Sequence, residues 1–258
     1  MGKLLEVEQL CVNFEGVAAL SDVSLDVDQG EVRGLVGPNG AGKTTLLNTL
    51  SRLVRPARGR LAFDGTNLLG VRPHRIVSLG MSRTFQNLAL FTSMTVLDNV
   101  LVGLHAARRA TLLGEMWRSR RAREGEQAFR RSGEEALRLL DLERLAGHRV
   151  ADLAYGHQKL VELARAVVAR PALLLLDEPA AGLNSEEKDD LVQRIRTIRD
   201  TTECAILLVE HDMEMVRRLC GRITVLNFGR KIAEGTPEQA LAHPDVVGAY
   251  LGGMHARA

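Results

Sequence analysis

The sequence predicts an α/β fold with a parallel sheet, an antiparallel β lobe and a helical lobe. Three observations predict it. An apolar run, a glycine-rich loop and a helical segment follow one another between Glu31 and Leu50. Apolar and polar residues alternate over short runs between residues 4 and 35, and strand-length and helix-length segments alternate from Leu153 onward. A period of two indicates half-buried strands, and strand–helix alternation indicates parallel strands with helices on both faces.

The composition bounds the class of protein. A chain of 258 residues with 45% hydrophobic content can bury a large core, and a net charge of +2 excludes a bulk nucleic-acid binder. The longest apolar runs, 172–176 and 204–209, fall far short of the roughly 20 residues that span a bilayer. Acidic residues in the first ten positions exclude a secretory signal. Three cysteines lack metal-ligand spacing and are expected to be small buried hydrophobes: Cys11, Cys204 and Cys220. We therefore expect a soluble, reduced, cytosolic protein.

The N-terminal runs Leu4–Leu10 and Val23–Val27 predict antiparallel strands. Phe14 lies between them and is one of only nine aromatic residues (1 Trp, 2 Tyr and 6 Phe). It can serve as a platform on which a nucleotide base stacks, or it can pack in the core, and core packing is the more common role of a lone aromatic residue.

The glycine-rich loop fits the phosphate-binding pattern of Gly, four residues, Gly, Lys and Ser or Thr. Its residues are Gly37, Pro38, Asn39, Gly40, Ala41, Gly42, Lys43, Thr44 and Thr45. Glycines let backbone N–H groups approach phosphate oxygens, Lys43 supplies a positive charge, and the Thr44 hydroxyl can ligate Mg²⁺. A buried strand at Glu31–Val36 and a helix at Lys43–Leu50 complete the unit. These features predict a P-loop NTPase (RecA-like) core.

The middle of the chain predicts two short strands and a helical section. The strands are Arg60–Phe63 and Met81–Phe85, the second followed by Gln86, and the helical section runs from Met94 to about Leu142. Six arginines lie between residues 118 and 131. A solvated helix face explains them most simply, and contact with lipid headgroups or a partner protein is the alternative.

The second half alternates strands and helices before a C-terminal tail. The expected elements are a helix at His157–Ala169, a strand at Ala172–Leu176, a helix at Ser185–Thr201, a strand at Ala205–Val209, and a hairpin of Ile223–Leu226 with Lys231–Ala233. Thr236, Pro237 and Gln239 predict a capped helix start. We therefore expect a single domain over residues 1–258, with a helical subdomain at about 87–160 and a helical tail at about 236–251.

Asp177 and Glu178 directly follow the apolar strand of the second half. Ligands of parallel sheets bind at the carboxyl ends of the strands, so Asp177 can hold Mg²⁺ there. Glu178, one residue further, can polarise a water that attacks the γ-phosphate. Adjacent acids after a strand also cap helices, but their combination with the loop at Gly37 favours the metal and water roles.

His211 and Gln86 are two further candidates at strand ends. His211 follows the strand at Ala205–Val209 by two residues and is a candidate contact to the γ-phosphate. The Gln86 amide can reach Mg²⁺ or the attacking water. A lone His at a strand end is more often structural, so both assignments depend on the other site residues.

A second anion site is predicted near residue 156. Gly156 comes immediately before an expected helix, and the N-terminus of a helix attracts anions. A chain that holds a phosphate loop and a separate anion site suggests a dimer in which each nucleotide is shared between two subunits.

The order of these elements over essentially the whole chain resembles the ATP-binding cassette (ABC) family. The matching segments are the loop at Gly37, Gln86, Leu153–His157, Asp177–Glu178, the turn Ala180–Asn184 and His211. The resemblance implies ATP and Mg²⁺ as ligands, Phe14 as the aromatic that stacks on adenine, Glu178 as the general base and His211 as a switch at the γ-phosphate. It also implies that Ala154, Tyr155, Gly156 and His157 contact the nucleotide of a partner subunit.

Further details resemble the ABC branch that energises branched-chain amino-acid import. Ala154 and Tyr155 replace the usual Ser and Gly, and Asn184 stands where Asp is usual, as in that branch, while His157 differs even from it. The resemblance implies a homo- or heterodimer of ATPase subunits under a transmembrane permease, on the inner face of the cell membrane. Urea, amide or aromatic-acid cargo is an alternative, and a soluble cassette protein without a membrane partner is a remoter one.

Overall fold

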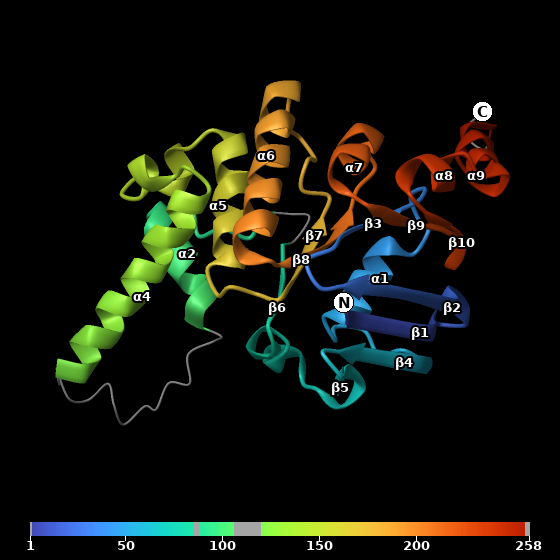
Figure 1. The fold of residues 1–258 in the computed structure, drawn as a ribbon, viewed down its shortest axis with the longest axis horizontal. Coiled ribbons are helices and arrows are strands. Elements are labelled where there is room, and N and C mark those ends of the chain that lie inside the picture. Colours follow the sequence, from blue (N-terminus) through green and yellow to red (C-terminus); the bar gives the residue numbers. More distant parts are fainter. Residues whose placement is uncertain (1, 85–87, 106–119, 256–258) are drawn as a thin grey trace.

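A six-stranded sheet forms the centre of the computed structural model, which describes residues 2–84, 88–105 and 120–255. Its strand order is β10-β9-β3-β8-β7-β6 (Figure 1). The strands are β3 (Val32–Val36), β6 (Met81–Arg83), β7 (Leu173–Asp177), β8 (Ala205–Val209), β9 (Arg222–Asn227) and β10 (Arg230–Gly235). The pairings are parallel except for the antiparallel hairpin β9–β10. The predicted parallel sheet and C-terminal hairpin are therefore confirmed.

The central strands form because most of their residues are apolar on both faces, with Arg33 of β3 and Asp177 of β7 as buried charged exceptions. Every residue of β3, β7 and β8 is buried, as expected for a parallel sheet covered on both sides. Leu174 and Leu176 of β7 belong to one apolar cluster, whereas Leu173 and Leu175 belong to another on the opposite face. The sheet therefore divides the core into two layers.

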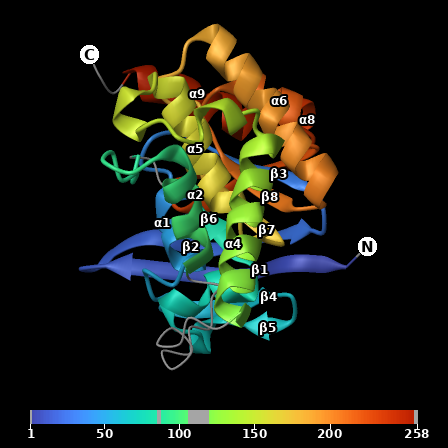
Figure 2. The same cartoon turned by 90° about the vertical axis from the view of Figure 1, so that its left-hand side faces the viewer.

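Helices cover the first face, and a helix together with a second sheet covers the other. The first face carries α5 (Tyr155–Val167), α6 (Ser185–Thr202) and α7 (Met213–Leu219). The other face carries α1 (Lys43–Leu50) and the antiparallel sheet of β1 (Lys3–Phe14), β2 (Val17–Asp28), β4 (Arg58–Phe63) and β5 (Thr66–Asn67). Helices on both faces are thus confirmed, and the antiparallel lobe shares the second face with α1. In Figure 2 this lobe and the helical layer lie on opposite sides of the central sheet.

The helical lobe consists of α2 (Val96–His105) and α4 (Arg120–Leu139), which pack against α5. Arg130 and Arg131 of the predicted basic segment are exposed, and Arg130 pairs with Glu134 at 3.1 Å, as expected for a solvated helix face. Short 3₁₀ turns follow at Glu143–Leu145 and Val150–Asp152, and three others lie between residues 68 and 79. In the described part of the chain, no helix combines the length and the apolar character needed to cross a bilayer.

The tail contains α8 (Pro237–Leu241) and α9 (Pro244–His255). The predicted cap of α8 is confirmed, because the Gln239 N–H donates to the Thr236 hydroxyl at 3.3 Å and the Thr236 N–H donates to the Gln239 side chain at 3.2 Å. The cysteine prediction is confirmed as well, since Cys11, Cys204 and Cys220 are buried free thiols.

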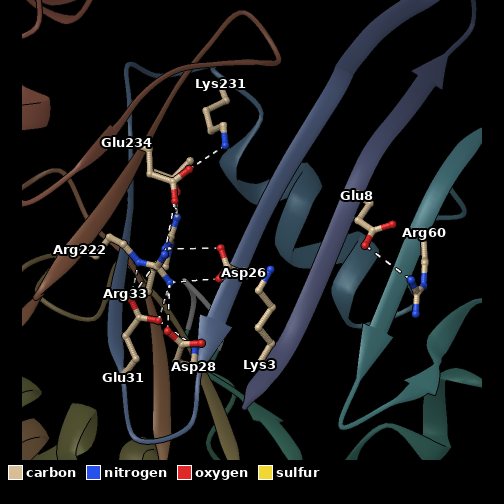
Figure 3. Close-up of polar contacts among 11 residues, drawn as sticks. Lys3, Glu8, Asp26, Asp28, Glu31, Arg33, Arg60, Arg222, Lys231 and Glu234 are labelled. Atoms are coloured by element: carbon tan, nitrogen blue, oxygen red, sulfur yellow. Dashed lines mark hydrogen bonds and ion pairs between the residues drawn. The ribbon is translucent and has the colours of Figure 1, made fainter. Parts of the chain in front are cut away.

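An ionic cluster joins the antiparallel lobe to the C-terminal hairpin (Figure 3). Its centre is Arg33 of β3, which is completely buried and pairs with Glu234 of β10. Arg33 also donates to the Thr224 hydroxyl of β9 at 2.8 Å and lies 4.0 Å from Asp26 of β2. Arg222 extends the network with a contact of 3.3 Å to the same Asp26. The cluster connects strands of both sheets.

Arg33→Ala should lower the free energy of unfolding by about 1 to 3 kcal/mol, because the buried Thr224 hydroxyl loses its hydrogen-bond donor and Asp26 keeps only more exposed cations such as Arg222. Lys3→Ala is the control, since Lys3 is 57% exposed in its contact with Asp26 and should change stability by less than about 1 kcal/mol. Urea unfolding of both variants measures the difference. Equal stability of the two variants would contradict a stabilising role for the cluster.

Candidate functional site

The phosphate loop connects β3 to α1, as predicted. Gly37 has φ +149°, and a Cβ atom at this position would lie 2.1 Å from the backbone oxygen of Leu226 in β9. Gly42 has φ +102°, and a Cβ atom there would lie 2.9 Å from the backbone oxygen of Ala19 and 2.8 Å from a methyl carbon of Leu20. Gly40 also has a positive φ but has no atom within 4 Å of such a Cβ. The two glycines that the motif fixes are therefore the two that backbone crowding requires.

Lys43 is the first residue of α1 and is almost fully buried. Its ammonium group donates to the backbone oxygens of Gly37 at 2.7 Å and Pro38 at 3.0 Å. Burial lowers the pKa of Lys43, while the carboxylates of Glu178 and Asp177 act in the opposite direction. The loop thus folds around a positive charge that lies near both acids.

A cavity of about 890 Å³ opens above the loop. It is lined by Val17, Ala18, Ala19, the whole segment Gly37–Thr45, Glu178, His211, Phe228, Gly229 and Tyr250. The structure therefore brings the predicted loop, acid and histidine together around one cavity. A cavity of this volume with a few polar side chains is typical of small-molecule sites.

Asp177 ends β7 and is 3% exposed. Its carboxylate accepts a hydrogen bond from Arg83 of β6 at 2.8 Å, and the same guanidinium donates to Asn48 at 2.8 Å and Ser51 at 3.3 Å. Arg83 therefore joins the strand end that carries Asp177 to the helix that follows the phosphate loop. The sequence analysis did not single out Arg83.

Glu178 and His211 lie at neighbouring strand ends. The Glu178 N–H donates to the backbone oxygen of Val209 at 2.9 Å, which fixes the residue beside β8. Glu178 has φ +48°, an uncommon conformation for a residue other than glycine. Its carboxylate lies 4.0 Å from Nδ1 of His211, whose side chain is 61% exposed. Two predicted residues from separate strands thus approach each other at the cavity.

Phe14 lies at the end of β1 with 47% of its surface exposed, so the core-packing interpretation is wrong. It is paired across the β1–β2 hairpin with Val17, which lines the cavity, whereas Phe14 is not among the lining residues. Base stacking by Phe14 stays a prediction. Gln86 falls outside the described residues.

Tyr250, Phe228 and Val17 line the cavity without having been predicted from the sequence. Tyr250 comes from α9, and burial raises the pKa of its hydroxyl, while the nearby Gly37 N–H acts in the opposite direction. No local pattern marks these residues, because each reaches the cavity through the packing of a distant segment.

The segment Ala154–His157 contributes no lining residue to this cavity. Helix α5 begins at Tyr155 with Ala154 as its cap residue, so the prediction that Gly156 precedes the helix is wrong by two residues. Gly156 lies in the first turn, where a Cβ atom would come within 2.5 Å of the Glu187 carboxylate of α6. The Tyr155 hydroxyl donates to the backbone oxygen of Ala181 at 3.4 Å. A second anion site at this helix end therefore stays a prediction.

Asp212, directly after His211, forms an ion pair that should make the stability of the fold depend on pH. Lys188 of α6 donates to the Asp212 carboxylate at 2.7 Å, and this hydrogen bond is the main cause that lowers the pKa of Asp212. A lowered pKa in the folded state means that Asp212 stabilises the fold above about pH 4, its unfolded value. This stabilisation is lost as the pH falls through the folded pKa.

We therefore expect Asp212→Asn to be less stable than the wild type at pH 7, with a difference that shrinks near about pH 3. Asn retains the side-chain oxygen that caps α7, so the substitution mainly removes charge. Urea unfolding at both pH values measures the effect. A difference that is the same at both would rule out the ion pair as its source.

Comparison with known proteins agrees with this geometry. Residues 20–181 match the family model described as ABC transporter, and residues 230–256 match the one described as branched-chain amino acid ATP-binding cassette transporter. Two relatives are high-affinity branched-chain amino acid transport ATP-binding proteins, BraF of Pseudomonas aeruginosa and LivG of Escherichia coli. Each shares 40% sequence identity with this chain, in an alignment that covers 96% of this chain and 98% of the relative.

Solved structures show the same relationship. The ADP conformation of an ATP-binding cassette of an ABC transporter is similar with a TM-score of 0.84 and 28% identity, over 98% of this chain and 100% of that one. A dimeric bacterial ABC transporter cassette has a TM-score of 0.76 and 25% identity, over 90% of this chain and 98% of that one. The chain therefore belongs to the ABC transporter family, as an ATP-hydrolysing cassette subunit.

Proposed function

We propose that ATP binds in the cavity above Gly37–Thr45 and is hydrolysed there. The observation that carries the proposal is the convergence of Lys43, Glu178 and His211, from three distant segments, on one cavity. The loop N–H groups and the N-terminus of α1 suit the phosphates, and Lys43 supplies charge. Phe14 is proposed to stack on adenine from the hairpin whose other strand lines the cavity.

The hydrolytic roles follow from position. A water attacks the γ-phosphorus, Glu178 accepts its proton, and the bond to the β-phosphate oxygen breaks to give ADP and phosphate. His211 is proposed to contact the γ-phosphate, since its ring lies beside Glu178. The buried Lys43 offsets negative charge on the phosphates.

Two oxygen donors suit Mg²⁺: the Thr44 hydroxyl, which lines the cavity, and the carboxylate of the buried Asp177, which is not among the lining residues. The Thr44 hydroxyl and the Asp177 carboxylate are hard ligands of the kind that Mg²⁺ prefers, and we propose both as metal ligands together with Gln86. When bound, the ion would neutralise negative charge on the β- and γ-phosphate oxygens. Arg83 keeps the buried Asp177 carboxylate charge-compensated and in place.

Two subunits are proposed to act as a dimer. Ala154, Tyr155, Gly156 and His157 do not line the cavity of their own chain, which supports a role toward the nucleotide of a partner. The dimeric structure of a similar cassette supports the same arrangement. The dimer is proposed to be a homodimer or a heterodimer with a second ABC ATPase subunit.

The cargo is proposed to be branched-chain amino acids, imported through a separate transmembrane permease. The names of BraF and LivG and the tail match at residues 230–256 support this proposal. The chain would then act at the inner face of the cell membrane. No nucleic-acid partner is proposed, because the net charge is only +2.

Uptake of labelled leucine tests the cargo, with urea and an aromatic acid measured in parallel. Cells whose only copy of the protein carries Glu178→Gln should lose leucine uptake and retain the other two. Loss of another cargo in place of leucine would keep the mechanism and overturn the substrate. Retention of all three would contradict a transport role.

A further inference from the structure

Glu210 is a completely buried acid that the hydrolytic scheme above does not use. It lies between Val209, the last residue of β8, and His211. Three backbone N–H groups donate to its carboxylate: Ala180 at 2.9 Å, His211 at 3.0 Å and Asp212 at 3.3 Å. A buried carboxylate is stable when such donors satisfy it.

The two carboxylate oxygens hold different segments. Oε1 accepts the N–H of Ala180, which lies two residues after Glu178 in the turn that follows β7. Oε2 accepts the N–H of His211 itself. One side chain therefore bridges the segments that hold the proposed base and the proposed γ-phosphate contact. The distance of 4.0 Å between Glu178 and His211 depends on where these two segments lie.

The same turn reaches the segment proposed to face the partner's nucleotide. Ala181, next to Ala180, accepts the hydrogen bond of the Tyr155 hydroxyl at 3.4 Å. The Tyr155 ring also packs against the turn, because a Cβ atom at Gly182 would lie 3.0 Å from it. Contacts thus run from Tyr155 through the turn and Glu210 to His211.

We propose that Glu210 is a positioning residue. It holds His211 in its place beside Glu178 and links both residues to the turn beside Tyr155. This inference rests on the proposed function and deepens it. A carboxylate can accept hydrogen bonds on both oxygens, whereas an amide of the same shape accepts on one side only. Glu210→Gln therefore keeps the volume and breaks one of the two connections.

The test compares Glu210→Gln with Glu31→Gln as a matched control. Glu31 is a largely buried carboxylate that precedes β3, at the end of the strand opposite the phosphate loop, where it accepts the Asp28 N–H at 2.8 Å and pairs with Arg222 of the ionic cluster at 2.9 Å. We expect ATP affinity within about threefold of wild type in both variants and a kcat at least about tenfold lower in Glu210→Gln alone. Equal kcat values in the two variants would overturn the proposal.

Histidine NMR provides a readout that stability alone does not change. With ¹⁵N-labelled histidine, the His211 ring signals should shift in Glu210→Gln, while those of distant histidines such as His74 and His243 stay in place. Unchanged His211 signals would overturn the proposal, as would shifts of all histidines alike, which indicate a general structural change. Glu210→Asp replaces Glu210→Gln if the latter does not fold, because its shorter side chain also loses one connection.

The two proposals can fail separately. A wild-type protein that binds no ATP would overturn the proposed function, and the NMR comparison would still decide whether Glu210 positions His211. A wild-type protein that hydrolyses ATP, together with a Glu210→Gln variant of full kcat, would overturn the role of Glu210 alone.

Discussion

Glu178→Gln is expected to lower the rate of ATP hydrolysis by about 100- to 10,000-fold, the usual contribution of a general base. ATP affinity should be retained, because the loop and Lys43 are unchanged. The variant should therefore accumulate as an ATP-bound dimer, with itself or with a sister subunit. Phosphate release and analytical ultracentrifugation in the presence of Mg²⁺ and ATP measure the two effects.

Glu238→Gln is a suitable control, since Glu238 is an exposed acid of α8 outside the cavity. It should hydrolyse ATP at the wild-type rate. Wild-type hydrolysis by Glu178→Gln would remove Glu178 from the proposed role, even if the variant still bound ATP.

Gly37→Ala is expected to abolish ATP binding, because its methyl group would lie 2.1 Å from the Leu226 backbone oxygen, a contact that cannot relax without moving β9. Gly40→Ala has free space at the same loop, so it should cost only the strain of its positive φ, of order 1 kcal/mol. Titration with a fluorescent ATP analogue compares the two variants.

We expect Gly40→Ala to bind within about tenfold of wild type and Gly37→Ala to show no measurable binding. Thermal unfolding of both variants separates loss of binding from loss of the fold. Equal binding by the two variants would show that backbone crowding at Gly37 does not shape the loop.

The elements that could be predicted from the sequence are those whose bounds are set by residues close together in the chain. Helix α1 and strand β8 have the predicted bounds, Lys43–Leu50 and Ala205–Val209, because an apolar pattern and a glycine or polar boundary fix each of them. The loop glycines follow a pattern that encodes close backbone approach. The cap at Thr236 likewise requires only residues within one turn.

The features that could not be predicted depend on packing between distant segments. Tyr250 reaches the loop at Gly37 from the last helix, and Arg83 meets Asp177 from a strand almost a hundred residues earlier. Arg33 appears in the sequence as a polar interruption of an apolar strand, and only the fold shows its carboxylate partners. Neither periodicity nor spacing carries such information.

Phe14 illustrates the same limit. A lone aromatic residue on a strand usually packs in the core, but Phe14 lies beyond the last buried residues of β1, at the hairpin end. The placement of its strand end, which tertiary packing determines, decides its environment. Its proposed contact with adenine depends on the bound nucleotide.

The structure of Glu178→Gln with Mg²⁺ and ATP tests the central claim most directly. The account predicts a dimer in which each ATP lies between Gly37–Thr45 of one subunit and Ala154–His157 of the other. The side chain at position 178 and that of His211 should both lie at the γ-phosphate. An ATP bound outside the cavity above Gly37–Thr45, or a nucleotide that Ala154–His157 of the partner does not contact in a closed dimer, would contradict it.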